Sequence, residues 1–200
     1  MEHSLALFLF VVSATITPGP NNIMIMTSSV NFGVKRSLPH LFGICLGFPA
    51  MVVLVGMGIS VLFEQYPIFH QIIKVLGILY LLYLSWKIAT APVNPMDDAK
   101  SKPLTFIQAA VFQWVNPKAW VMATGAVAAY TTLSGDLTWQ VLYIALNFLV
   151  VAFPSVAIWL FFGLALKRLL QAPIHQKIFN IAMALLLVSS MLPVIIDVFS

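Results

Sequence analysis

Six long apolar stretches divide this 200-residue sequence, and each is long enough to cross a lipid bilayer. A transmembrane helix needs about 20 mostly apolar residues. The stretches cover residues 5–30, 37–63, 68–91, 104–132, 138–166 and 174–199. Only 8% of the residues are charged, against about 25% in an ordinary soluble domain. We therefore expect an all-α membrane protein with six transmembrane helices. The charged residues form short clusters between long apolar runs, which excludes a disordered or nucleic-acid-binding protein. The single cysteine, Cys45, excludes a disulfide-rich secreted protein.

Basic residues beside the stretches predict the orientation of the chain. They flank the odd-numbered connections: Lys35 and Arg36 at the first, Lys87, Lys100 and Lys102 at the third, and Lys167, Arg168 and Lys177 at the fifth. The even-numbered connections and both ends of the chain have no basic residue. Cytoplasmic loops of membrane proteins carry an excess of Lys and Arg. The odd-numbered connections are therefore expected in the cytoplasm, with both termini outside.

One polar linker lies near the middle of the chain. Residues 92–103 hold three prolines, two aspartates and two lysines. They separate a first unit of three stretches, residues 1–91, from a second one, residues 104–200. Two units of three helices have opposite orientations in the membrane, so the predicted architecture is a pair of three-helix inverted repeats within one membrane domain.

The positions of four prolines support this repeat. Pro18 in the first stretch and Pro117 in the fourth are 99 residues apart, and Pro49 in the second and Pro154 in the fifth are 105 apart. We therefore expect these prolines to interrupt corresponding helices at corresponding places, which is typical of transporters with inverted repeats. Proline is common in membrane helices, so a chance match stays open. We expect broken helices in the first and fourth stretches.

The two main interruptions have a specific chemistry. The first is Thr17-Pro18-Gly19-Pro20-Asn21-Asn22, and the second is Asn116-Pro117. Proline lacks an amide hydrogen, so these prolines leave carbonyl groups without helical partners. The carbonyl groups concerned belong to Ala14, Ile16 and Gln113. In a membrane such groups must be buried in protein or line a wet cavity.

Each interruption also begins a new helix. Asn116 followed by proline is typical of a helix start, and Gly19 or Asn21 suits the same role in the first stretch. Amide groups and the positive end of the helix dipole would then face a bound anion such as a carboxylate. The freed carbonyl groups would accept an ammonium group. The alternative to a binding site is that the two interruptions are structural kinks with capping asparagines.

Lys118 follows the second interruption, near the middle of the fourth stretch. A charge at this depth costs about 2.5–3.5 kcal/mol on insertion scales and marks a functional site by default. The alternative is a lysine that snorkels or bonds to the freed carbonyl groups. No acid lies at this depth, so cationic substrates are disfavoured. Gln113 and Asn147 are the other deep polar groups, each as consistent with a helix–helix hydrogen bond as with a ligand contact.

Three segments of the chain resemble motifs of the LysE/RhtB family. They are Thr17-Pro18-Gly19-Pro20-Asn21-Asn22 in the first stretch, Gly77, Tyr80-Leu81, Leu84 and Lys87 in the third, and Phe112-Gln113-Trp114-Val115-Asn116-Pro117-Lys118 in the fourth. The resemblance covers essentially the whole chain. It implies a bacterial inner-membrane amino-acid exporter, nearest to the branch that exports homoserine, threonine, cysteine or O-acetylserine. It also implies transport driven by the proton gradient without a bound cofactor, and a translocation path shaped by Pro18, Gly19, Pro20, Asn21, Asn116, Pro117 and Lys118.

The sequence therefore favours an exporter of small neutral amino acids, and a passive channel for small solutes is the alternative. The proton would be held by Lys118 or by the substrate, or transport would run downhill. The expected partners are the substrate, protons and the bilayer, with assembly into a homo-oligomer left open. An enzyme or a metal site is not expected, because the histidines lie near the ends of different stretches.

Overall fold

The computed structural model describes residues 2–59, 65–92, 102–132, 135–170, 172–192 and 195–196. In these segments all regular secondary structure is helical, as the composition predicts. The helices are α1 (Glu2–Ile16), α2 (Pro20–Leu54), α4 (Pro67–Ala89), α5 (Phe106–Phe112), α6 (Pro117–Tyr130), α7 (Leu137–Leu169) and α8 (Pro173–Ser189). A π-helical turn, η1 (Val55–Ile59), extends α2, and a 3-10 turn, η2 (Gln113–Val115), follows α5.

Three of the helices are clearly long and apolar enough to cross a membrane. They cover Pro20–Gly58, Gln71–Ala89 and Leu137–Leu169. The other apolar helices are shorter, at Ser4–Ile16, Phe106–Val115 and Pro173–Ser189. The predicted first and fourth stretches are shortened because their helices are interrupted, at Thr17–Gly19 and at Asn116.

The first two predicted stretches are separated within the expected connection, residues 31–36. Gly33 there has the non-helical angles φ 76° and ψ 169°, so α2 consists of two helices joined at a kink, and Ser28 before it lies within 2.9 Å of His40 after it. This positive φ is available to glycine at little cost, so the chain turns there without a longer connection. One element therefore contains the second part of the first stretch and most of the second.

The second proline pair does not interrupt its helices, which corrects the expectation for the second and fifth stretches. Pro49 lies inside α2 and Pro154 inside α7, and both helices continue past them. A proline in a helix removes one hydrogen bond and can bend the helix without ending it. The predicted interruptions in the first and fourth stretches are present.

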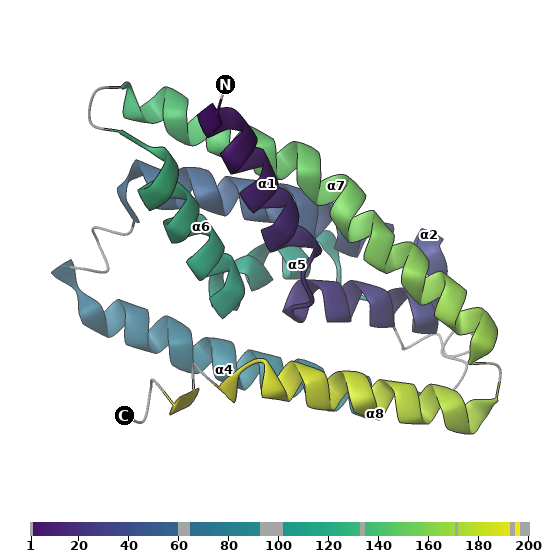
Figure 1. The fold of residues 1–200 in the computed structure, drawn as a ribbon. Coiled ribbons are helices and arrows are strands. Elements are labelled where there is room, and N and C mark those ends of the chain that lie inside the picture. The colour runs from purple at the N-terminus through teal and green to yellow at the C-terminus, as the bar shows by residue number, and fades with distance from the viewer. Residues whose placement is uncertain are drawn as a thin grey trace.

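Helix α2 forms its most extensive packing against α7, and α5 also packs on α2. Figure 1 shows α4 and α8 side by side along one edge of the molecule, and the two helices are in contact. The largest buried cluster lies between α1, α2, α6 and α7, with the rings of Phe48 and Phe148 edge to face at 4.9 Å. Many large apolar side chains face outward, Leu79, Trp86 and Phe161 among them, as lipid contact requires.

Two glycines bring the backbones of α2 and α5 close together. A Cβ atom on Gly47 would lie 2.6 Å from Ala110 Cα, and one on Gly43 would lie 2.6 Å from Ala109 Cβ. Small residues four apart permit this close approach in membrane helices. The packing fixes the end of α5, and with it the second interruption, against α2.

Candidate functional site

Both interruptions begin helices with the local geometry that the sequence predicts. Helix α2 starts at Pro20 with Gly19 as its N-cap, and α6 starts at Pro117 with Asn116 as its N-cap. The Asn116 side chain accepts a hydrogen bond of 3.2 Å from the Lys118 amide. Proline fits the first turn of a helix because the amide groups of that turn have no partner within the helix, so the missing amide hydrogen costs no hydrogen bond.

Lys118 joins the two interruptions. Its ammonium group donates to the carbonyl oxygen of Thr17 at 2.7 Å, to the Thr17 hydroxyl at 2.8 Å and to the carbonyl oxygen of Pro18 at 3.4 Å. A Cβ atom on Gly19 would lie 2.7 Å from Lys118 Cδ, so the lysine packs where glycine leaves space. Among the described residues these hydrogen-bond partners of the ammonium group are neutral oxygens, and its charge remains uncompensated.

A second link lies beside the first. Asn21 Nδ2 donates to Gln113 Oε1 at 2.8 Å, and Gln113 Nε2 donates back to Asn21 Oδ1 at 3.1 Å. Gln113 is fully buried, and its Nε2 also bonds to the carbonyl oxygen of Ala109 at 2.8 Å. Gln113 thus makes a helix–helix hydrogen bond, one of the two roles that the sequence left open.

Asn22 holds the end of α1 against the start of α2. Its Nδ2 atom donates to the carbonyl oxygens of Thr15 at 3.0 Å and Thr17 at 2.8 Å. The Thr15 hydroxyl in turn lies 3.0 Å from the Ser155 hydroxyl on α7. The first interruption is therefore a fixed structure rather than a hinge without contacts.

The carbonyl groups that we expected to be free are already hydrogen-bonded. The Ala14 oxygen accepts from the Thr17 hydroxyl at 3.0 Å, the Ile16 oxygen from Trp159 Nε1 at 3.0 Å, and the Gln113 oxygen from the Asn116 amide at 3.3 Å. A buried carbonyl group without a partner is costly, which explains why nearby donors take up all three. The oxygens of Thr17 and Pro18 face the lysine instead.

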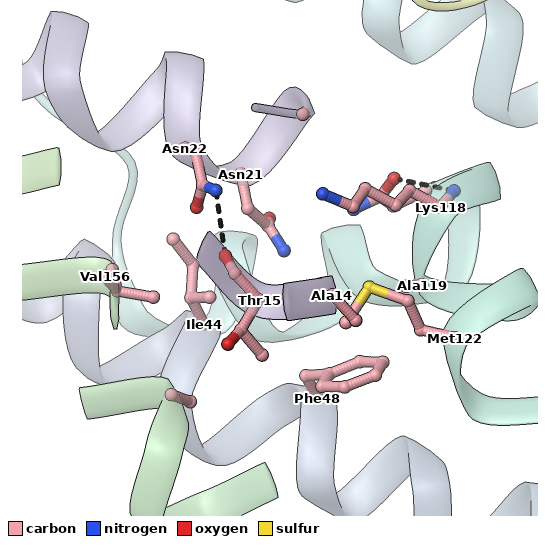
Figure 2. Close-up of a pocket in the computed structure, with 13 residues that line it drawn as sticks. Ala14, Thr15, Asn21, Asn22, Ile44, Phe48, Lys118, Ala119, Met122 and Val156 are labelled. Atoms are coloured by element: carbon pink, nitrogen blue, oxygen red, sulfur yellow. Dashed lines mark hydrogen bonds between the residues drawn. The ribbon is translucent and has the colours of Figure 1, made fainter. Parts of the chain in front are cut away.

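A small cavity of about 40 Å³ lies between the interruptions and α7. Figure 2 shows Asn21, Asn22 and Lys118 on its polar side, with Ile44, Phe48, Met122 and Val156 around its apolar side. Its remaining lining residues are Ala14, Thr15, Gly19, Asn116, Ala119 and Ala152. Among the described residues, the lining therefore contains one cation and no carboxylate. The chemistry of this lining, though not its present volume, suits a small molecule with an anionic group and a short, uncharged side chain.

The predicted site residues are divided between this cavity and its surroundings. Gly19, Asn21, Asn22, Asn116 and Lys118 line the cavity, whereas Thr17 and Pro18 contribute the oxygens that Lys118 contacts. Pro20 and Pro117 occupy the first turns of their helices. Asn147 does not line the cavity, and its amide bonds to the Tyr143 carbonyl oxygen of its own helix at 2.9 Å.

The sequence analysis missed three residues that complete the site. Thr15, Ser155 and Trp159 each bond across helices, and Thr15 also lines the cavity. Ser155 follows Pro154 directly in the sequence, which was the one available indication. Polar residues four apart on α7, Ser155 and Trp159, both face α1.

Comparison with known proteins gives a consistent result. Residues 12–196 match the family model described as LysE type translocator. The cysteine/O-acetylserine efflux proteins of Escherichia coli K12 and of Shigella flexneri are each 31% identical to the chain over 185 residues, covering 92% of both sequences. No solved structure matches.

Proposed function

The chain belongs to the LysE type translocator family, and from this premise we propose that it exports a small neutral amino acid of the cysteine, O-acetylserine, threonine or homoserine type. Membership makes it a multi-pass inner-membrane transporter of amino acids and not an enzyme. The observation on which the substrate class depends is Lys118, a cation held by neutral oxygens beside a cavity whose described lining has no acid.

In the proposed binding step the substrate carboxylate takes the place of the neutral oxygens around Lys118. A carboxylate carries a full negative charge that attracts the ammonium group, whereas a carbonyl or hydroxyl oxygen carries only a partial one. The carbonyl oxygens of Thr17 and Pro18 then accept the substrate ammonium group, in place of the Ala14, Ile16 and Gln113 oxygens expected from the sequence. The apolar side, with Phe48 and Met122, contacts the short side chain.

In the proposed transport cycle the cavity opens alternately to each side of the membrane. The units at residues 1–91 and 104–200 act as two inverted repeats of three helices, with both termini outside. The links Lys118–Thr17 and Asn21–Gln113 join the two units. A movement that separates the interruptions breaks both links, and substrate contacts replace the first of them. The proton gradient drives export, with a proton moving against the amino acid.

Counterflow in proteoliposomes tests this function. Vesicles that contain the purified protein are loaded with unlabelled O-acetylserine, cysteine, threonine or homoserine, and uptake of the labelled compound is measured. A transporter gives saturable, transient accumulation with one of the four, and a pH gradient across the membrane raises the initial rate. Uptake that rises linearly with concentration and shows no counterflow would instead indicate a passive channel. Lysine serves as the cationic control and should not be taken up.

A further inference from the structure

A second cavity, of about 80 Å³, lies between α2, α4 and the segment that precedes α5. Its polar lining residues are Thr27, Ser28, Asn31, His40, Lys87 and Lys102. A neighbouring depression of about 230 Å³ shares Lys87 and Lys102 with it. The two lysines thus lie at the boundary between a buried pocket and a wider opening, and both are exposed.

The described lining of this second cavity is positively charged. The described residues that line it and the neighbouring depression include two lysines and no carboxylate. Lys87 lies over the ring of Tyr83 at 5.7 Å, a contact that leaves its charge uncompensated. Lys102 comes from a separate part of the chain, near the end of the linker. Two cations from different elements that converge on one opening raise the local concentration of anions.

A buried side chain with unused hydrogen-bonding capacity lies deeper in the same cavity. His40 is fully buried, and its Nδ1 atom lies 2.9 Å from the Ser28 hydroxyl. Its Nε2 atom has no hydrogen-bond partner among the described residues. Buried polar groups are nearly always paired, so an unpaired one calls for an explanation such as a ligand.

The first part of α2 leads from this cavity to the central one. Asn21 and Asn22 line the central cavity, and Thr27, Ser28 and Asn31 line the second. Ten helical residues span about 15 Å at 1.5 Å per residue. Lys35 and Arg36 follow directly, on the side for which the sequence predicts the cytoplasm. The second cavity therefore lies about 15 Å along α2 from the central one, toward the side that the sequence predicts to be cytoplasmic.

We infer that this second cavity is an inner subsite that binds the carboxylate of the substrate before the substrate reaches Lys118. This rests on the proposed function as an amino-acid exporter. Lys87 and Lys102 attract the carboxylate at the opening. The Ser28 hydroxyl and the His40 imidazole hold the polar part of the substrate further in.

The test compares a charge-neutral variant of the subsite with a matched surface variant. Lys87→Gln with Lys102→Gln removes the two charges of the opening. Lys35→Gln with Lys177→Gln removes two exposed charges on the same predicted side that do not line either cavity. Both proteins are reconstituted in phosphatidylcholine vesicles, and export of O-acetylserine is measured from the side that carries these lysines.

Loss of a contact used for initial binding raises KM with little change in kcat. We expect KM to rise about tenfold for the Lys87/Lys102 variant, as for loss of one charge-assisted contact, and to stay unchanged for the surface variant. An unchanged KM for both variants would overturn the subsite. An effect found only in vesicles that contain phosphatidylglycerol would overturn it too, since the lysines would then bind a lipid headgroup. Wild-type protein without export of any of the four amino acids would contradict the proposed function itself.

Discussion

The ammonium nitrogen of Lys118 lies 2.7 Å from the carbonyl oxygen of Thr17, so the start of α6 is tied to the end of α1 across 101 residues of sequence. Asn21 and Gln113 make the complementary link, from the start of α2 to the end of α5. Each helix start that follows one interruption is thus bonded to residues in or just before the other. This crossed arrangement places a cation and two helix starts around one cavity.

Replacing Lys118 with methionine should remove the proposed carboxylate partner while keeping most of the side-chain length. The loss of a hydrogen bond to a charged group costs about 1.5–3 kcal/mol, which corresponds to about 10- to 150-fold in transport efficiency. Initial rates in proteoliposomes measure the effect, and thermal unfolding in detergent checks that the protein still folds. Lys177→Met is the control, because Lys177 is exposed on α8. Unchanged export by Lys118→Met would exclude a role in binding.

Replacing Gly19 with alanine should displace Lys118 without straining the backbone. Gly19 has φ −174° and ψ 177°, an extended conformation that any residue adopts. The new Cβ atom would lie 2.7 Å from Lys118 Cδ and 3.1 Å from its Nζ, and a misplaced binding group costs on the order of tenfold or more in rate. The flexible lysine can move aside, so we expect export to fall with only a small change in melting temperature.

Gly125→Ala is the matched control for Gly19→Ala. Gly125 lies in α6, and a Cβ atom there meets nothing within 4 Å. Alanine should leave export intact and stabilise the helix by roughly 0.5–1 kcal/mol. If Gly19→Ala exports as well as Gly125→Ala, the position of Lys118 is not important for transport.

The Asn21–Gln113 pair should behave as a coupled unit in a double-mutant cycle. Asn21→Ala leaves the buried Oε1 of Gln113 without its hydrogen-bond donor, and Gln113→Leu likewise leaves the Asn21 amide without its partner. The coupling energy between polar side chains in membrane helices averages about 0.6 kcal/mol and reaches about 1.7 kcal/mol. Unfolding in mixed micelles should show that the double variant loses less than the sum of the two single variants.

Asn147→Ala supplies the comparison for this cycle, because Asn147 bonds within its own helix. Combined with Asn21→Ala, it should give additive changes in the free energy of unfolding. Additivity for Asn21 and Gln113 as well would show that their hydrogen bonds contribute nothing to the link between the two units.

The sequence predicted those parts of the site that depend on local chemistry. Pro18 and Asn116-Pro117 end and restart helices through groups within a few residues, so the interruptions were visible without a structure. The composition likewise sufficed for an all-helical membrane protein. Lys118 was predicted as a site residue because a charged side chain within an apolar stretch is costly in a membrane and therefore indicates a function.

The parts that the sequence analysis missed or got wrong depend on contacts between distant segments. Pro49 and Pro154 have the same local chemistry as Pro18, yet α2 and α7, which pack along each other, continue past them. The partner of Lys118 is Thr17, and nothing in the spacing of the chain specifies that pairing. The expectation for the Ile16 carbonyl group failed for the same reason, since its donor, Trp159, is 143 residues away.

Replacing Trp159 with phenylalanine decides what the Ile16 carbonyl group does. Phenylalanine keeps most of the ring and removes the Nε1 donor, which lies 3.0 Å from the Ile16 oxygen. If the bond only holds the end of α1 on α7, the free energy of unfolding should fall by about 1 kcal/mol and KM should stay unchanged. Trp139→Phe, at an exposed position of the same helix, should change neither quantity. A lower KM for Trp159→Phe would mean that the released Ile16 oxygen accepts the substrate ammonium group, and the assignment of that role to Thr17 and Pro18 would then be wrong.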